Sequence, residues 1–144
     1  MYNNSNSYRY RGDAMQTTKY SRQRETLLEI LRDTKCHPNA DWLYEKVRGE
    51  IPNISLGTVY RNLSKLSSEG TIRKIEVGSG GVHFDADISP HAHLVCEKCE
   101  RILDIYTDYT EMLRCDAEQK TRARVSNCSV LFDGLCEDCA GEKM

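Results

Sequence analysis

The sequence predicts an α+β protein, with an N-terminal winged helix-turn-helix domain followed by a small α/β dimerisation domain. The first observation is a run of three helical patterns followed by a hairpin pattern with a glycine-rich tip. The second is a shorter half in which short strand patterns surround two Cys-x-x-Cys motifs. A chain of 144 residues suffices for one compact domain or two small ones.

We expect four segments: a flexible arm at residues 1–17, the winged-helix domain at 18–85, a hinge at 86–91 and the dimerisation domain at 92–144. The arm is polar and has no hydrophobic periodicity, which is typical of disorder. The hinge is short and patternless. The last segment is too small to bury a large core alone, so a bound metal and dimerisation are expected to stabilise it.

Capping residues divide the first half into three helices. Ser21 is a suitable N-cap for a helix that ends near Thr34, and its apolar residues recur at helical spacing. Asn39 caps the second helix and Ser55 the third, and Gly70 supplies the stop of the third helix.

The strands are predicted from short apolar runs between turn residues. Runs at 71–77 and 82–84 flank glycines and predict a β-hairpin. Beyond the hinge we expect a helix with an apolar stripe at 108–120. Around it we expect strands at 93–96, 101–106, 121–125 and 128–132.

Composition excludes several classes of protein. Hydrophobic residues make up 39% and charged residues 29% of the chain, as in soluble globular proteins. There is no apolar run that could form a transmembrane helix or a secretion signal, so we expect a cytoplasmic protein that does not enter a membrane. Residues 1–82 contain 13 Lys and Arg against 9 Asp and Glu, and residues 83–144 contain 7 against 13. Only the first half could therefore face phosphates.

Cysteine spacing predicts a structural zinc site. Two Cys-x-x-Cys motifs can bring four thiolates together, and four soft ligands suit a permanently held Zn²⁺. The alternative is a pair of independent redox dithiols. The three cysteines without partner spacing are expected to be small buried residues. The zinc ligands are Cys96, Cys99, Cys136 and Cys139, and the remaining cysteines are Cys36, Cys115 and Cys128.

Histidine and aspartate residues suggest a second metal site. In an extended segment residues two apart point the same way, so His91 and His93 can share one ion. His37 in a connector, Asp85 at the end of the hairpin and Asp104 on a neighbouring strand complete a set that suits Fe²⁺ or Mn²⁺, with Zn²⁺ also compatible. The alternative is that these side chains are ordinary polar surface. His83, which alternates with Asp85, ranks below them as a supporting or surface residue.

Four stretches resemble the ferric uptake regulator family. Residues 55–63 (SLGTVYRNL) resemble its recognition helix, and residues 91–99 (HAHLVCEKC) resemble its hinge and zinc signature. Residues 19–24 (KYSRQR) are similar to the start of its first winged-helix helix, and the final Cys-x-x-Cys also matches. The resemblance covers roughly residues 18–140.

The resemblance is strongest to the peroxide-responsive repressors, whose sensing metal is held by three His and two Asp. It implies that His37, Asp85, His91, His93 and Asp104 bind the regulatory Fe²⁺ or Mn²⁺. It further implies a homodimeric repressor, not an enzyme, that binds double-stranded operator DNA while this metal is bound. Hydrogen peroxide would be the signal, since iron-mediated oxidation of His37 or His91 would release the DNA.

The winged-helix context suggests which residues contact DNA. Tyr60 and Arg61 are expected in a groove, with Thr58 at the start of the same helix. Arg22 and Arg24 are expected to contact phosphates. Arg73 and Lys74 on the hairpin are further phosphate candidates.

The chain departs from the family pattern in three places. Residues 1–17 show no amphipathic helix, Glu100 stands where Gly is frequent, and Cys128 stands where His is common. Three other functions remain open from the sequence. These are an iron- or zinc-responsive repressor of metal uptake without His oxidation, a small metallohydrolase, and a zinc-stapled scaffold.

Overall fold

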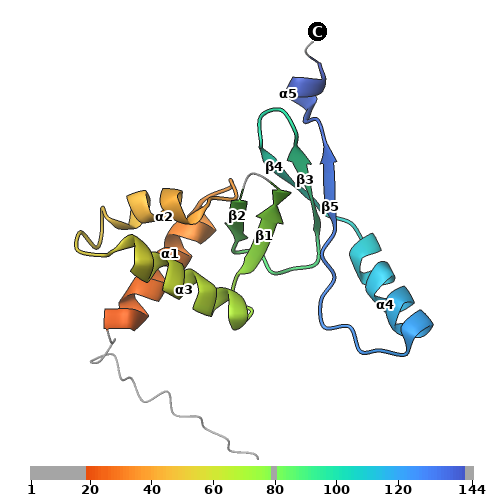
Figure 1. The fold of residues 1–144 in the computed structure, drawn as a ribbon, viewed down its shortest axis with the longest axis horizontal. Helices are drawn as coiled ribbons and strands as arrows, with labels where there is room; N and C mark the ends of the chain where they lie inside the picture. Colours follow the sequence, from red (N-terminus) through yellow and green to blue (C-terminus); the bar gives the residue numbers. More distant parts are fainter. Residues whose placement is uncertain (1–18, 79–80, 142–144) are drawn as a thin grey trace, which may run out of the picture.

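The computed structural model describes residues 19–78 and 81–141. The predicted arm at 1–17 lies outside the described residues, as do two residues of the predicted hairpin tip and the last three of the chain. Three helices, a two-stranded hairpin and a three-stranded sheet follow one another along the molecule (Figure 1). This arrangement confirms the predicted fold class.

The three N-terminal helices are α1 (Lys19–Asp33), α2 (Ala40–Val47) and α3 (Leu56–Ser68). The side chain of Asn39 accepts the N–H of Trp42, and that of Ser55 accepts the N–H of Thr58, so both predicted caps are confirmed. The predicted cap at Ser21 is wrong, because that residue lies inside α1. The core between the helices consists of Leu27, Leu31, Ala40, Leu43, Val47, Ile54, Val59, Leu63, Leu66, Ile72 and Phe84.

The hairpin lies between the helices and the second sheet (Figure 1). Its strands, β1 (Arg73–Val77) and β2 (Gly81–Asp85), pair in antiparallel fashion. Phe84 belongs to the helical core, whereas Ile75 and Val77 form a second apolar cluster with Val95 and Ile102 of the three-stranded sheet. The hairpin thus packs against both halves of the chain.

The second sheet has the order β4-β3-β5. Its central strand β3 (Ala92–Cys96) is antiparallel to β4 (Ile102–Ile105) and parallel to β5 (Leu131–Gly134). The register places His93 directly opposite Asp104. The last described element is a short helix that the sequence did not predict, α5 (Glu137–Ala140).

The predicted strand at 121–125 is wrong. Thr121 is the last residue of α4 (Tyr109–Thr121), and residues 122–130 form no regular element. Backbone groups of this segment form hydrogen bonds with side chains of α4, where a strand would bond to a neighbouring strand. Glu118 accepts the N–H of Val125 at 2.8 Å, and Arg114 donates to the Val125 carbonyl at 3.4 Å.

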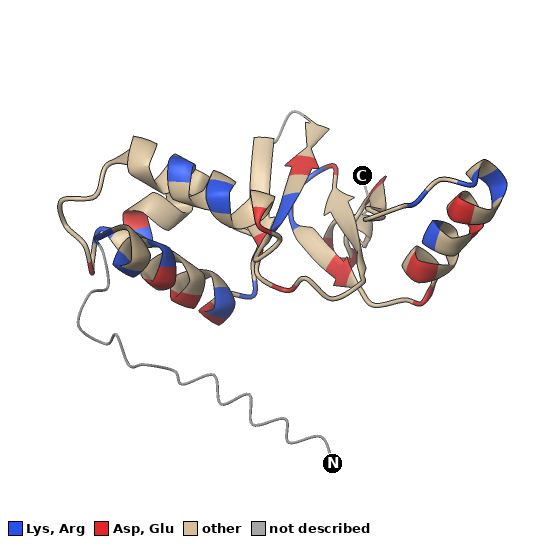
Figure 2. Ribbon diagram, turned by 90° about the horizontal axis from the view of Figure 1, so that it is seen from below, with Lys and Arg blue, Asp and Glu red and all other residues tan. Residues whose placement is uncertain are grey.

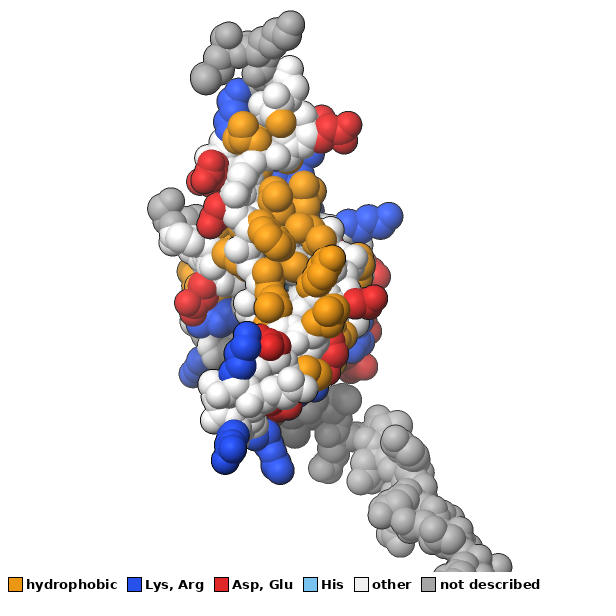
Figure 3. All heavy atoms as spheres, turned by 90° about the vertical axis from the view of Figure 1, so that its right-hand side faces the viewer, with side chains coloured by type: hydrophobic (Ala, Val, Ile, Leu, Met, Phe, Trp, Pro, Cys, Tyr) orange, Lys and Arg blue, Asp and Glu red, His pale blue; other side chains and the backbone are white. Residues whose placement is uncertain are grey.

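The apolar stripe of α4 does not pack within the chain. Tyr109, Met112 and Leu113 are between 49% and 68% exposed, and Thr110 is the buried residue of the helix. Among the described residues, six further large apolar ones on the second half or the hinge are also at least one-third exposed: Ile88, Leu103, Tyr106, Leu131, Phe132 and Leu135. Figure 3 shows apolar side chains gathered on one face of this part of the molecule.

Charged residues occur along the helices of both halves (Figure 2). None of the described helices combines the length and the apolar character that crossing a membrane requires.

Candidate metal centres and nucleic-acid interface

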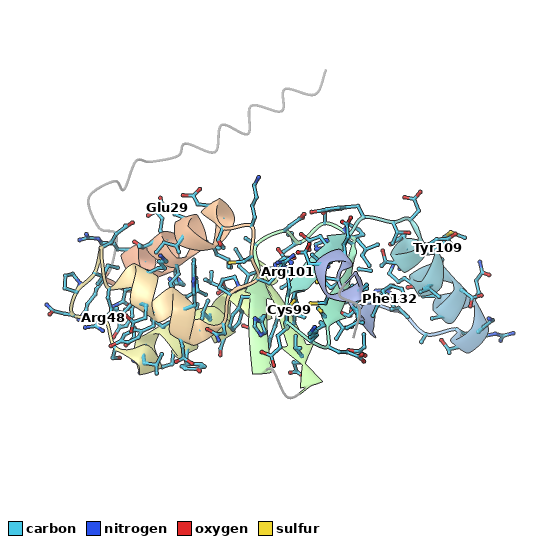
Figure 4. The ribbon with its side chains drawn as sticks, turned by 90° about the horizontal axis from the view of Figure 1, so that it is seen from above. Glu29, Arg48, Cys99, Arg101, Tyr109 and Phe132 are labelled. Carbon is cyan, nitrogen blue, oxygen red and sulfur yellow. The ribbon has the colours of Figure 1, made fainter. Side chains whose placement is uncertain are left out.

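The four predicted zinc ligands lie together at the outer end of the second sheet. Cys96 ends β3 and Cys99 lies in the following turn. Cys136 is the residue before α5, and Cys139 lies within α5. Figure 4, seen from above, labels Cys99 and Arg101 beside the blue helix α5. The four sulfur atoms lie within 4.8 Å of one another, and none forms a disulfide.

This geometry fits a tetrahedral zinc site. Four Zn–S bonds of normal length place neighbouring sulfur atoms about 3.8 Å apart, and Cys99 Sγ lies 3.7 Å from Cys136 Sγ. Backbone N–H groups of Cys136 and Cys99 lower the pKa of the Cys96 thiol to about 6. By contrast, the neighbouring Cys136 thiol raises the pKa of Cys139 to about 12. A zinc ion held by the four sulfur atoms would deprotonate the coordinating thiols.

The turn after the first Cys-x-x-Cys contains a strained residue. Glu100 has φ 62°, and its N–H donates to the Cys96 carbonyl at 2.9 Å. A residue with a Cβ loses about 1–2 kcal/mol in this left-handed region. We therefore expect Glu100→Gly to raise the free energy of unfolding by about 1 kcal/mol, measured by urea denaturation of the zinc-loaded protein.

Glu100→Ala is the matched control for this prediction, because it removes the carboxylate but keeps the Cβ. It should unfold like the wild type. A Glu100→Gly protein no more stable than Glu100→Ala would show that the turn stores no strain.

The five predicted ligands of the second site come from four parts of the fold. His37 lies in the connector between α1 and α2, Asp85 ends β2, His91 precedes β3, His93 lies on β3 and Asp104 on β4. The hairpin positions the connector, since Phe84 N–H donates to the Pro38 carbonyl at 2.9 Å. The cluster therefore joins the winged helix to the second sheet.

Two carboxylate oxygens lie at the centre of the three imidazoles. Asp85 Oδ2 is 2.9 Å from His91 Nε2, 3.1 Å from His93 Nε2 and 3.9 Å from His37 Nδ1. Asp104 Oδ1 is 2.7 Å from His37 Nε2 and 3.2 Å from the Nε2 atoms of His91 and His93. The side chains of the three His and of Asp85 are at most 7% exposed.

The hydrogen bonding of His91 tests whether this cluster fits a cation. Its Nδ1 lies 2.7 Å from the Ser89 carbonyl, which can only accept, so Nδ1 carries the hydrogen. In the neutral ring Nε2 then presents a lone pair to the Asp85 carboxylate. Two lone pairs at this distance repel one another unless a proton or a metal ion lies between them. The donor set of imidazoles and carboxylates suits a divalent transition metal.

Asp85 is held in its ionised form. Burial alone would raise its pKa, but hydrogen bonds with His93 and from the Asp87 N–H, together with the charge of His37, lower the pKa well below its usual value. A carboxylate that is ionised and almost inaccessible is available as a metal ligand at neutral pH.

An open pocket of about 410 Å³ leads to the cluster from the solvent. His37, Asp85 and Asp104 lie along it, with Arg32 and Lys35 on the α1 side and Tyr106 on the β4 side. A small uncharged molecule could reach the ligands of this cluster by this route.

Three cysteines and one histidine lie outside the two clusters. Cys36 and Cys115 are exposed and Cys128 is partly exposed, so their predicted burial is wrong. His83 contacts the connector: its Nδ1 lies 2.7 Å from the His37 carbonyl. Of the two roles that the sequence suggested for His83, supporting residue or surface residue, this contact agrees with the first.

Sequence reasoning missed two residues beside the cluster. Tyr106 stacks on the ring of His91, and Arg73 donates to hinge carbonyls instead of pointing to solvent. Because Tyr106 follows Asp104 by two residues in an extended segment, alternation could have placed both on one face. No local signal could have found the Arg73 contacts.

The predicted DNA contacts lie on exposed parts of the winged helix. Tyr60 and Arg61 are exposed on α3, and Arg61 donates to Thr58 Oγ1 at 3.1 Å. Arg22 is exposed and Arg24 partly exposed on α1. Helix α3 contains basic but no acidic residues, and its ribbon shows only blue among the charged colours (Figure 2).

The sequence matches the model of the ferric uptake regulator family over residues 15–132. The chain belongs to the ferric uptake regulator family. Residues 15–132 contain the whole His/Asp cluster and the first pair of clustered cysteines.

Several relatives in the family are peroxide regulators. The peroxide operon regulator of Bacillus subtilis is 32% identical over 118 residues, covering 82% of this chain and 81% of that protein. The peroxide-responsive repressor PerR of Staphylococcus saprophyticus is 31% identical over 117 residues, covering 81% and 79%.

Solved structures show the same fold. The peroxide stress regulator of Campylobacter jejuni is 34% identical, with a TM-score of 0.77 and coverage of 84% of this chain and 91% of that one. The ferric uptake regulator Fur of Helicobacter pylori, at 23% identity, has a TM-score of 0.72 over 86% and 83% of the two chains.

Family membership and the two ligand clusters together define the class of function. The chain is a metal-dependent, DNA-binding transcriptional repressor of the ferric uptake regulator family, and not an enzyme.

Proposed function

We propose that this repressor senses hydrogen peroxide through a regulatory metal and that its DNA-binding form is a homodimer. One observation carries the proposal: the imidazoles of His37, His91 and His93 surround two carboxylates, and these five groups come from both halves of the chain. The named peroxide regulators at 31–34% identity support the same sensing function.

The cysteine cluster would hold Zn²⁺ permanently. It joins the end of β3 to α5 and so closes a sheet that has little apolar core of its own. This role is structural, because four thiolates leave no open coordination position.

The His/Asp cluster would hold Fe²⁺ or Mn²⁺ through His37, Asp85, His91, His93 and Asp104. These residues tie the connector, the hairpin and the hinge to the second sheet and so fix the orientation of α3. In a dimer this orientation sets the spacing of two recognition helices, which must match two half-sites in operator DNA. The five side chains would bind the metal most tightly when the two halves have the DNA-competent orientation. Metal binding would therefore increase the fraction of molecules in that orientation.

The exposed apolar face of the second half would form the dimer interface. It includes Tyr109 on α4 and Phe132 on β5, which are labelled in Figure 4. Large apolar side chains that pack against nothing within one chain mark a protein interface. In such a dimer Thr58, Tyr60 and Arg61 would face a groove of the DNA, and Arg22 and Arg24 would contact phosphates.

Hydrogen peroxide would transfer one oxygen atom to a ligand His and release the other as water, so the imidazole loses two electrons overall; Fe²⁺ held by these residues would supply the activation of the peroxide. His37 and His91 are the candidates. An oxidised imidazole no longer offers its lone pair, so the tie between the hairpin and the second sheet weakens and the DNA is released. The side chains around Mn²⁺ would hold the same conformation without this oxidation.

Mass spectrometry of peptides from the peroxide-treated Fe²⁺ form tests the sensing step. We expect one added oxygen atom on His37 or His91, and none in the Mn²⁺ form. Asp104→Glu should lower the oxidised fraction more than it lowers metal-dependent DNA binding. If oxidation is confined to cysteines while iron still controls DNA binding, the protein is an iron- or zinc-responsive repressor without His oxidation.

A further inference from the structure

The hinge is held on one side by a side chain of the hairpin. Arg73 Nη2 donates to the carbonyls of Ile88 at 3.1 Å and Ser89 at 3.2 Å, and Nη1 donates to the carbonyl of His91 at 3.4 Å. Arg73 therefore gathers three carbonyls of one short segment. It also stands opposite Asp85 in the β1–β2 register, so it links the hinge directly to the strand that carries a central carboxylate.

A side chain of the second sheet holds the hinge on the other side. The Tyr106 hydroxyl donates to Asp87 Oδ2 at 2.7 Å, and the Tyr106 ring stacks on that of His91 with centroids 5.0 Å apart. Asp87 Oδ1 accepts the N–H of Ser89 at 2.9 Å. The Ser89 carbonyl in turn faces His91 Nδ1 at 2.7 Å. This chain of contacts ends on the imidazole of His91.

Neither residue belongs to the His/Asp cluster, yet both act on the segment that aims His91 into it. An arginine can gather several carbonyls because its planar guanidinium carries five N–H donors in a fixed arrangement. A lysine has the same charge but only a single ammonium group. Groups that orient a metal ligand from outside commonly change metal affinity by 10–100-fold.

We propose that Arg73 and Tyr106 form a hinge clasp that positions His91 and thereby sets the affinity of the regulatory metal site. This inference rests on the proposed function of that site. It also gives Arg73 a role within the protein, where the sequence suggested a phosphate contact. The clasp would order the hinge before the metal binds, and so reduce the ordering that metal binding must impose.

Titration of the zinc-loaded full-length protein with Mn²⁺ tests the clasp without DNA or peroxide. We expect Arg73→Lys and Tyr106→Phe each to weaken Mn²⁺ binding about tenfold, with zinc content unchanged. Hydrogen exchange of the hinge amides in the Mn²⁺-free protein should become faster in both variants. Lys74→Met is the matched control, because Lys74 is exposed on the same strand and pairs with Glu76. It should bind Mn²⁺ as the wild type does.

Wild-type Mn²⁺ affinity in both Arg73→Lys and Tyr106→Phe would overturn the clasp, as would equal weakening in Lys74→Met. The salt dependence of DNA binding at saturating Mn²⁺ is a second readout. The quantity to compare is the slope of the logarithm of the DNA-binding constant against the logarithm of the salt concentration. If the magnitude of this slope falls by about one in Arg73→Met and is restored in Arg73→Lys, Arg73 is a phosphate contact and the proposal is overturned. A wild-type protein that binds no Mn²⁺ would instead refute the regulatory site itself.

Discussion

Cys96→Ser is expected to abolish zinc binding and to unfold the second half of the protein. Cys96 is fully buried at the end of β3, and the other three ligands lie in a turn and around a four-residue helix that contains no buried residue. Structural zinc contributes about 10 kcal/mol or more to the folding of small zinc domains. We therefore expect bound zinc to fall from one per chain to near zero, and Tm to fall by at least about 10 °C.

Cys36→Ser is the control for this substitution, because Cys36 is exposed and lies outside the cysteine cluster. It should retain zinc, the wild-type Tm and the dimer. Zinc content by metal analysis, thermal unfolding by circular dichroism and mass by sedimentation are the measurements. A Cys96→Ser protein that keeps both its zinc and its dimer would rule out the structural site.

Asp85→Asn is expected to give the largest loss of metal-dependent DNA binding. The substitution keeps the shape of the side chain but removes the charge that faces the three imidazoles. Outer-shell changes cost 10–100-fold in metal affinity, and loss of a direct ligand should exceed that range. We expect Mn²⁺ affinity to fall by more than about 100-fold and DNA affinity to fall to the level of the Mn²⁺-free protein.

The control is Asp41→Asn, which removes an exposed carboxylate from α2 in the same half of the chain. It should leave Mn²⁺ affinity unchanged. Mn²⁺ titration and DNA binding by fluorescence anisotropy measure the two effects. Undiminished Mn²⁺ binding by Asp85→Asn would show that the His/Asp cluster is not the regulatory site.

Local sequence signals predicted the winged helix because its elements are specified locally. Asn39 and Ser55 cap their helices as their residue types predict, and Gly70 has φ 76° just beyond α3. The α1 boundary failed at Ser21 because a good capping residue is also tolerated inside a helix. The strand predicted at 121–125 failed because Glu118 and Arg114 bind the backbone of Val125, which strand propensity cannot anticipate.

The ligand clusters were predicted from residue type, spacing and family resemblance, but their supporting contacts were not. Cys-x-x-Cys spacing is a local property, and so is the alternation of His91 and His93 along one strand. The contacts of Arg73 with the hinge depend on how β1 lies beside residues 88–91, which only the folded chain shows. The exposure of the apolar stripe of α4 could not be predicted for the same reason. A helical pattern shows which residues share a face but not which surface packs against that face.

The proposed switch is tested most directly by the DNA affinity of the Fe²⁺-loaded dimer before and after hydrogen peroxide. The probe is a DNA duplex selected for binding to the Mn²⁺-loaded protein. We expect both metals to raise DNA affinity by at least about tenfold, as is typical of allosteric coupling. Peroxide should then remove this gain from the Fe²⁺ form and leave the Mn²⁺ form bound. Equal DNA affinity with and without metal, or an Fe²⁺ form that stays bound after peroxide, would contradict the proposed switch.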